Sequence, residues 1–266
     1  MQRNLNIPNV LSIAGSDPSG GAGIQADLKT FAALGVYGMA AITAMTAQNT
    51  QGVRGFIAVP PAFLKDQLEA IFDDINVAAV KIGMLANAEI IETVADVLAR
   101  YRPVHIVLDP VMIASSGDSL ISAEAIDALK THLIPLASVI TPNIPEGEKL
   151  MRKAVLDMEA AAENLLSLGA GAVLLKGGHL KGAAVDVLAN VNGIRSFEAE
   201  RIVTKNTHGT GCTLSSAVAA YLARGFSLEE SVESAKAYIT AAITHSSELN
   251  VGHGHGPVHH GYMRVL

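Results

Sequence analysis

Short runs of aliphatic and β-branched residues alternate with amphipathic helical segments along almost the whole chain. The runs predict strands over residues 10–14, 37–44, 53–59, 79–82, 105–108, 139–140 and 173–175. Apolar residues at helical spacing predict a helix ending at residue 34 and further helices over residues 62–74, 88–100, 123–132 and 157–168. Strands separated by helices pair in parallel through right-handed crossovers, and helices then cover both faces of the sheet. We therefore expect an α/β fold in which residues 1–266 form a single domain around a central, mostly parallel sheet.

The last third of the chain departs from this alternation. Residues 184–203 predict two or three short strands with a turn at Asn192 and Gly193, a common hairpin dipeptide. Two helices then complete the predicted core. Ser227 and Glu230 form a capping-box pattern at the start of the second of them.

Composition limits the class of protein. Half of the 266 residues are hydrophobic, so the chain can bury a large core. A net charge of −6, 4% aromatic residues and no Trp argue against binding to nucleic acid or to a membrane surface.

The uncharged stretch between Lys29 and Arg54 is interrupted at Gly35 and Gly38, so we expect a helix ending at Gly35 and then a buried strand, and no membrane span. A single cysteine, Cys212, and the absence of a signal-peptide core at the N-terminus indicate a cytoplasmic protein.

Glycine and polar residues follow the predicted strands at their carboxyl ends, where open α/β sheets bind ligands. These segments are residues 15–23, 83–84, 109–111, 141–146 and 176–179. Any one of them could be an ordinary strand-to-helix turn. Their recurrence at one edge of the sheet favours a binding site there.

Residues 206–212 carry a sharper signal. Gly209 and Gly211 permit a tight turn and a close approach of the backbone to a ligand. The first turn of the helix that follows offers unpaired N–H groups and the positive end of the helix dipole, which together bind anions. In phosphoryl transfer such donors hold the moving phosphoryl group. A glycine-rich helix start without a ligand is the alternative interpretation.

Five side chains have a functional interpretation, and three of them also have a structural one. Asp27 shares the apolar face of the first predicted helix, so its inward carboxylate must bond either to backbone N–H groups of the glycine-rich loop or to a ligand. Asp109 and Glu146 each follow a strand at the same sheet edge and could organise Mg²⁺. Lys176 could meet a phosphate or remain solvated. Cys212 lies at a helix N-terminus, which can lower the pKa of a thiol, or it is simply buried and inert.

Several short motifs do not support other functions. Residues 117–120 spell Gly-Asp-Ser-Leu, as in certain esterases, but they lie in the middle of the chain instead of after the first strand. The P-loop, nucleophile-elbow and zincin patterns do not occur. The histidine-rich segment 253–260 has no acidic or cysteine partner beside it, which favours a structural role over metal binding.

An ordered set of segments is more specific than any single motif. It comprises residues 13–27, 47–50, 81–85, 108–112, 141–143 with Glu146, 175–179, 206–212 and 256–260. This set resembles the hydroxymethylpyrimidine/phosphomethylpyrimidine kinases of thiamine biosynthesis, a family of the ribokinase-like superfamily, over nearly the whole chain. The resemblance implies a ribokinase-like fold, use of ATP and Mg²⁺, and a homodimer. It also implies two successive phosphorylations, first of 4-amino-5-hydroxymethyl-2-methylpyrimidine and then of its monophosphate.

The resemblance further implies roles for individual residues. Gln48 would bind the aminopyrimidine edge, because an amide offers both a donor and an acceptor. The same pocket would be lined by Gly15, Ala22, Asp27, Met84 and Val111. Mg²⁺ would be held by Asp109 and Glu146, and the nucleotide phosphates by Asn143, Lys176 and Thr207. Catalysis would rest on Lys176 and on an anion hole formed by Gly209, Thr210, Gly211 and Cys212.

Cys212 occupies the position where many members of the superfamily have an aspartate that accepts the substrate proton. A thiol has a reference pKa near 8.5, and base catalysis usually contributes about 10²–10⁴-fold. We therefore expect the metal and the anion hole to carry most of the rate.

Two alternative functions remain open. One is a pyridoxine or pyridoxal kinase of the same superfamily, against which Cys212 after Gly-Thr-Gly argues. The other is a non-catalytic pyrimidine-binding protein, against which the joint presence of Asp109, Glu146, Lys176 and the anion loop argues.

Overall fold

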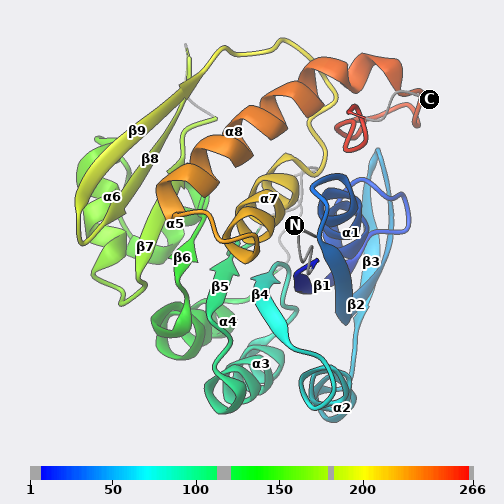
Figure 1. Ribbon diagram of the computed structural model, residues 1–266, viewed down its shortest axis with the longest axis vertical. Helices are drawn as coiled ribbons and strands as arrows, with labels where there is room; N and C mark the ends of the chain where they lie inside the picture. Colours follow the sequence, from blue (N-terminus) through cyan, green and yellow to red (C-terminus); the bar gives the residue numbers. More distant parts are fainter. Residues whose placement is uncertain (1–6, 113–120, 179–182, 264–266) are drawn as a thin grey trace, which may run out of the picture.

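One nine-stranded sheet forms the centre of this computed structural model, which describes residues 7–112, 121–178 and 183–263. The strands lie in the order β3-β2-β1-β4-β5-β6-β7-β8-β9 (Figure 1). Their bounds are β1 (Asn9–Ser16), β2 (Tyr37–Asn49), β3 (Gly52–Ala58), β4 (Val77–Ile82), β5 (His105–Leu108), β6 (Val139–Ile140), β7 (Ala172–Lys176), β8 (Ala184–Asn190) and β9 (Gly193–Ala199). Pairing is parallel from β2 through β1 to β7, and β3, β8 and β9 join antiparallel at the two edges. The predicted α/β fold with a mostly parallel sheet is confirmed.

Helices cover both faces of this sheet. Their bounds are α1 (Gly23–Ala33), α2 (Pro61–Phe72), α3 (Ala88–Tyr101), α4 (Ala123–Ala128), α5 (Ile144–Met151), α6 (Met158–Leu166), α7 (Thr210–Ala223) and α8 (Leu228–Thr244). Helices α1, α7 and α8 pack on one face, whereas α2, α3, α4 and α6 pack on the other (Figure 1). The capping box predicted at the start of α8 is present, because Ser227 and Glu230 bond to each other's backbone N–H groups.

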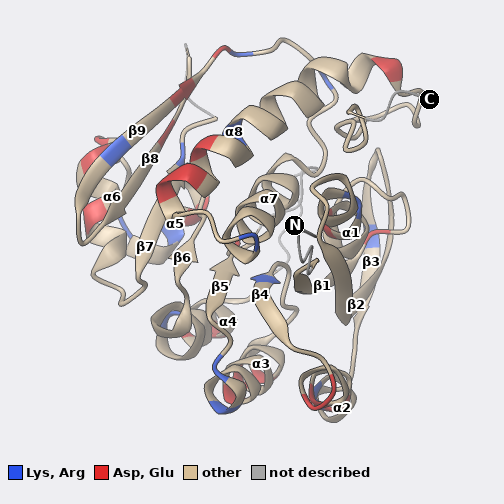
Figure 2. Ribbon diagram, in the orientation of Figure 1, with Lys and Arg blue, Asp and Glu red and all other residues tan. Residues whose placement is uncertain are grey.

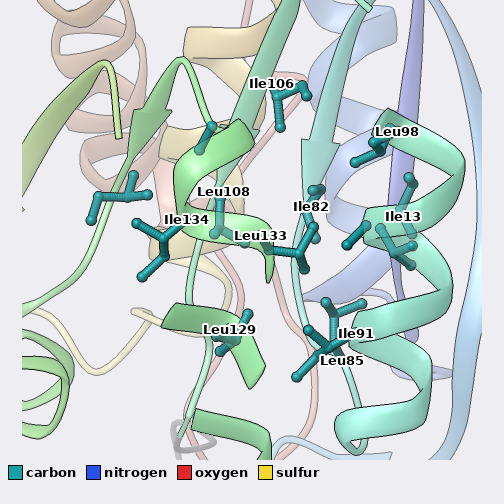
Figure 3. Packing of buried hydrophobic residues seen from close by; sticks show 14 of the residues in the cluster. Ile13, Ile82, Leu85, Ile91, Leu98, Ile106, Leu108, Leu129, Leu133 and Ile134 are labelled. Atoms are coloured by element: carbon teal, nitrogen blue, oxygen red, sulfur yellow. The ribbon is translucent and has the colours of Figure 1, made fainter. Parts of the chain in front are cut away.

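The core follows from the period-two alternation of buried strand residues. In β1, Leu11 and Ile13 pack toward the α3 side of the sheet, while Val10 packs toward the α7 side. Figure 3 shows Ile82 of β4 and Leu108 of β5 among the side chains of the α3 side. Because both sheet faces are covered, these strands are apolar on both faces, and burying each such side chain contributes about 1.5–3 kcal/mol.

Two local predictions differ from the structure, and one helix was not predicted. The two-residue turn between β8 and β9 consists of Val191 and Asn192, and Gly193, at φ 119°, is already the first residue of β9. The helix predicted over residues 123–132 is interrupted, because α4 passes into a wide π-type turn at Leu129–Leu133. Helix α5 was not predicted, although Asn143 and Glu146 form a capping box at its start.

Charged residues lie mainly on the outer elements. Figure 2 shows acidic residues gathered at the start of α8, and residues of both signs along the outer helices. Within the described ranges, no helix combines the length and the apolar content needed to cross a membrane.

Candidate active site

A cavity of about 630 Å³ opens at the carboxyl ends of the parallel strands. Its wall contains all but one of the residues predicted for the site. They are Gly15, Ala22, Gln48, Met84, Asp109, Val111, Asn143, Glu146, Lys176, Thr207, Gly209, Thr210, Gly211 and Cys212. The predicted recurrence of polar and glycine residues at one sheet edge therefore reflects a single shared cavity. The exception is Asp27.

Asp27 does not line the cavity, so the prediction that it lines the substrate pocket is wrong. Its side chain has no solvent exposure, and Lys81 Nζ lies 2.9 Å from both of its carboxylate oxygens. Ser12 Oγ donates to Asp27 at 2.6 Å and Ser216 Oγ donates at 2.7 Å. The structural alternative, in which Asp27 accepts from the glycine-rich loop, is also wrong, because Asp17 takes that role. The inward position of Asp27 was foreseen correctly, but its partners come from β1, β4 and α7.

Lys81 is a residue that sequence reasoning missed. It stands in β4 among apolar residues and is completely buried. Burial alone would lower the pKa of Lys81, but the carboxylate of Asp27 raises it above its usual value. The signal was available, since a lysine inside an apolar strand needs a buried acid, and Asp27 is an inward acid that needs a cation.

The glycine-rich loop after β1 is organised by Asp17. This carboxylate accepts hydrogen bonds from the backbone N–H groups of Ser19, Gly21 and Ala22, at distances between 2.9 and 3.2 Å. His208 Nε2 lies 2.8 Å from the same side chain. Burial alone would raise the pKa of Asp17, but the hydrogen bonds from His208 and Ser19 lower it to about 2. Asp17 is therefore ionised and acts only as an acceptor.

The start of α7 has the features of an anion site. Gly209, at φ +79°, is its N-cap residue and supplies no side-chain cap, while the N–H of Thr210 donates to the Thr207 carbonyl at 3.2 Å. The first turn therefore presents backbone N–H groups without a side-chain acceptor, as the sequence predicted. A Cβ atom at Gly211 would lie 3.3 Å from Lys176 Nζ and 3.6 Å from Asp109 Oδ2. The helix start thus faces a cation and a carboxylate directly.

Lys176 forms an ion pair with Asp109, one of the two predicted metal carboxylates. Its Nζ lies 2.8 Å from Asp109 Oδ1, which also accepts from Thr141 Oγ1 at 3.0 Å. Burial would raise the pKa of Asp109, but Lys176 and Lys81 lower it, so the carboxylate stays ionised. Burial and the neighbouring Asp109 raise the pKa of Glu146 to about 7. This buried, mutually repelling pair is a setting in which a divalent cation is favourable.

The donor set fits Mg²⁺ without completing its coordination shell. Among the residues the structure describes, no three His, Cys, Asp or Glu side chains converge as metal ligands. Mg²⁺ takes one or two carboxylates and completes its shell with water and substrate phosphate oxygens. Asp109 and Glu146 are compatible with that mode of binding.

The thiol of Cys212 is protonated at neutral pH. Burial raises its pKa to about 11, even though Lys81 opposes this shift. Of the two interpretations that the sequence left open, this shift favours the inert thiol, because desolvation of the thiolate outweighs the helix dipole.

The part of the cavity beyond Lys176 contains residues that no sequence motif indicated. Lys236 of α8 lies 2.5 Å from Asp186 Oδ2 and donates to the Ala184 carbonyl at 2.8 Å. Asp186 in turn accepts from the N–H of Gly177, the residue after Lys176. Further wall residues here are Ala199, Glu200, Arg201, Ile202, Leu214, Ile239, Thr240 and Ile243.

The histidine-rich segment has the structural role favoured for it. His208 N donates to the Gly256 carbonyl, and His260 Nε2 lies 3.0 Å from Thr213 Oγ1. Burial lowers the pKa of His260 to about 3, so this ring is neutral. Residues 117–120 and His179 lie outside the described residues.

The fold and the cavity together define a ribokinase-like small-molecule kinase. The family model described as phosphomethylpyrimidine kinase matches residues 17–259. The hydroxymethylpyrimidine/phosphomethylpyrimidine kinase of Escherichia coli is 49% identical over 95% of this chain and 97% of its own length. The thiamine biosynthesis bifunctional protein of Geobacter sulfurreducens is 54% identical over 95% of this chain, which spans only 52% of that longer protein.

Solved structures agree with these sequence relatives. The phosphomethylpyrimidine kinase of Clostridium difficile is 48% identical, with a TM-score of 0.80 over 89% of this chain and 99% of that one. An ADP complex of Bacillus subtilis pyridoxal kinase is 40% identical, with a TM-score of 0.90 over 98% of this chain and 100% of that one. The chain belongs to the phosphomethylpyrimidine kinase family and is a kinase, as the sequence resemblance implied.

Proposed function

We propose that the protein transfers the terminal phosphoryl group of ATP to the hydroxymethyl group of 4-amino-5-hydroxymethyl-2-methylpyrimidine. In a second reaction it would phosphorylate the resulting monophosphate to the diphosphate, within thiamine biosynthesis. The observation that carries the proposal is the shared cavity, in which a small apolar pocket adjoins an uncapped helix N-terminus and a lysine. A neutral heterocycle and a polyphosphate require these two environments side by side.

The pyrimidine end consists of Gly15, Ala22, Gln48, Met84 and Val111. A Cβ atom at Gly15 would lie 3.1 Å from Met84 Sδ, so a larger residue there would narrow the pocket. The Gln48 amide is half-buried at the end of β2, and its Oε1 accepts from Thr46 Oγ1 at 3.1 Å. That contact leaves the amide N–H₂ group of Gln48 to recognise an acceptor on the ring.

The phosphate end would bind the nucleotide through Lys176, Asn143 and Thr207 and hold the transferring group at Gly209, Thr210 and Gly211. When bound at Asp109 and Glu146, Mg²⁺ would neutralise charge on the phosphate oxygens. The backbone N–H groups of the α7 start and the Lys176 ammonium would stabilise the charge that develops during transfer.

Cys212 would line the acceptor side without acting as a thiolate base, because its pKa lies near 11. Phosphoryl transfer through a loose transition state needs little help from a base. The chain's main contributions would therefore be positioning of the two substrates and electrostatic stabilisation.

A coupled assay of ADP release tests this function. Purified protein with ATP and Mg²⁺ is offered the pyrimidine, its monophosphate or pyridoxine, each in a separate reaction. We expect release with the first two substrates. If the monophosphate yields no diphosphate, the two-step assignment is wrong.

Pyridoxine kinase activity is the second candidate, favoured by the similarity to Bacillus subtilis pyridoxal kinase. Preferred release of ADP with pyridoxine would support it. No release with any of the three substrates, from folded protein, would instead support a binding protein without catalysis.

We also propose that residues 1–266 act as one domain and that two copies form a cytoplasmic homodimer. Exposed apolar side chains on β2 and β3, namely Met45, Phe56 and Ile57, are a part of the described surface that such a contact would cover. Light scattering in solution should give twice the mass of one chain. A mass equal to one chain at micromolar concentration would contradict the dimer.

A further inference from the structure

Two loops that are far apart in the sequence meet across the cavity at Asp17 and His208. Both residues line the cavity, and they are only 2% and 4% exposed. Because Asp17 is ionised, the contact of 2.8 Å is a hydrogen bond donated by His208 Nε2 to Asp17 Oδ2. The same Oδ2 atom accepts from the N–H groups of Gly21 and Ala22. One carboxylate oxygen therefore holds both the loop that carries Ala22 and the loop that leads into Gly209.

The two loops are also in steric contact around this hydrogen bond. A Cβ atom at Gly21 would lie 2.3 Å from Cδ2 of the His208 ring, which leaves no room for a side chain. A Cβ atom at Gly209 would lie 1.8 Å from the Gly21 carbonyl oxygen. Glycine is therefore required at both positions, and the two backbones cannot shift independently.

The backbone of His208 is fixed from its other side by the C-terminal segment. His208 N donates to the Gly256 carbonyl at 3.0 Å, and Val258 N donates to the His208 carbonyl at 3.4 Å. The side chain of His208 thus extends from a braced position toward Asp17. The imidazole therefore fixes the distance between the loop of Asp17 and the loop of His208, whose backbone is held by the C-terminal segment.

We propose that Asp17 and His208 are positioning residues that set the distance between the pyrimidine pocket and the anion hole. This inference rests on the proposed function, because it concerns the two subsites of that reaction. Ala22 belongs to the proposed pyrimidine pocket, and Gly209 opens the proposed anion hole. The acceptor hydroxyl and the phosphoryl group react efficiently only when they are held within about 3–3.5 Å of each other in the right orientation. The Asp17–His208 hydrogen bond is a direct side-chain link between the two loops that hold these groups.

Steady-state kinetics of three variants test the proposal. We expect His208→Ala to lower kcat at least tenfold while the KM for ATP stays within about threefold, because the nucleotide contacts at Lys176 and Asn143 are unchanged. His208→Gln places an amide N–H near Asp17 and should restore kcat to within threefold of wild type. Asp17→Asn should lower kcat as His208→Ala does, and the double variant should be no slower than the slower single variant.

The matched control is His245→Ala. His245 Nδ1 lies 2.6 Å from Glu248 Oε1 on the surface, so this variant also removes a histidine paired with an acid, outside the cavity. We expect its kcat and KM to equal those of wild type.

Hydrogen–deuterium exchange supplies a readout that does not depend on the substrate. In His208→Ala, peptides covering residues 17–23 should exchange faster than in wild type, although the substitution lies in the other loop. If wild type fails to phosphorylate the pyrimidine, the proposed function is wrong, and the exchange result still decides whether the pair couples the loops.

Two results would overturn the positioning role. One is a kcat of His208→Ala within twofold of wild type together with unchanged exchange at residues 17–23. The other is a loss in His208→Ala that His208→Gln does not restore. Should His208→Ala fail to fold, the Gln and Asn variants decide by the same criteria.

Discussion

Lys81 Nζ lies 2.9 Å from each carboxylate oxygen of Asp27, and neither side chain is exposed to solvent. This pair joins β4 to α1, and its hydrogen bonds from Ser12 and Ser216 extend the connection to β1 and α7. The ion pair is therefore bonded through Ser216 to α7, the helix whose N-terminus forms the proposed anion hole.

Removing one partner of this pair should destabilise the protein strongly. Lys81→Met leaves the Asp27 carboxylate buried without its cation, which typically costs about 3–5 kcal/mol in the free energy of unfolding. Urea denaturation followed by circular dichroism measures the loss. The double variant Lys81→Met/Asp27→Leu leaves no unpaired charge and should lose much less; a double variant that is worse than Lys81→Met would contradict this account.

The decrease in the free energy of unfolding at acid pH should depend on Asp17. Its folded pKa of about 2 lies below the ordinary value of 3.8, so its stabilisation is present above pH 4 and is lost as the pH falls toward 2. The deficit of Asp17→Asn relative to wild type should therefore be about 2 kcal/mol at pH 7 and about 1 kcal/mol at pH 3. Urea unfolding of both proteins at the two pH values tests this, and a deficit that grows toward acid would refute it.

Cys212 should react slowly with alkylating reagents in the folded protein. Its pKa near 11 leaves a far smaller thiolate fraction at pH 8 than a free thiol has, so labelling by iodoacetamide should be about 100-fold slower or more. Mass spectrometry against urea-unfolded protein gives the ratio. Equal rates in the two states would show that the fold does not raise the pKa of this thiol.

Cys212→Ser and Gly211→Asp should differ sharply in turnover. Serine at position 212 retains a small polar group where no thiolate acts, so we expect measurable kcat. Aspartate at 211 would place a carboxylate beside Lys176 and Asp109, because a Cβ atom there already lies 3.3 Å from Lys176 Nζ. Equal and complete loss of activity in both variants, with the fold intact by circular dichroism, would contradict the prediction that Cys212→Ser is the more active variant.

Asp109→Asn should raise the Mg²⁺ concentration needed for half-maximal activity by about tenfold or more, because it removes one of two proposed carboxylate ligands. A Mg²⁺ titration of the initial rate measures the shift. Glu124→Gln, at an exposed acid in the first turn of α4, is the matched control and should leave the titration unchanged. If Asp109→Asn gave the same Mg²⁺ titration as wild type, Asp109 would not be a metal ligand.

The fold and most of the cavity wall were predictable because they depend on local patterns. Strand and helix periodicity indicated the sheet, and glycine and polar residues marked the strand ends that meet in the cavity. Asn143 shows the limit of such reasoning, because the residue predicted for phosphate binding is also the N-cap of α5. A helix start and a ligand loop share the same residue types, so the sequence alone did not separate them.

What escaped prediction depends on contacts between distant segments. The partners of Asp27 are 15, 54 and 189 positions away, and only the packing of α1 and α7 on the sheet brings them together. The sequence left two interpretations of Cys212 open for a similar reason. Its position at a helix start is local, but the desolvation that raises the pKa of its thiol is produced by the surrounding fold.

The contacts of residues 254–258 have a consequence for the order in which the protein matures. Gly254 N donates to Thr50 Oγ1, and the backbone of His208 bonds to Gly256 and Val258, so one late segment bonds both to the β2–β3 hairpin and to the loop before α7. Gly254 follows Thr50 by 204 positions, which at about 5–20 residues per second corresponds to roughly 10–40 s of synthesis. A ribosome-bound chain can form most of its sheet well before this segment emerges. A nascent polypeptide should therefore gain most of its secondary structure before residues 254–258 emerge, and its full catalytic competence only after they have emerged.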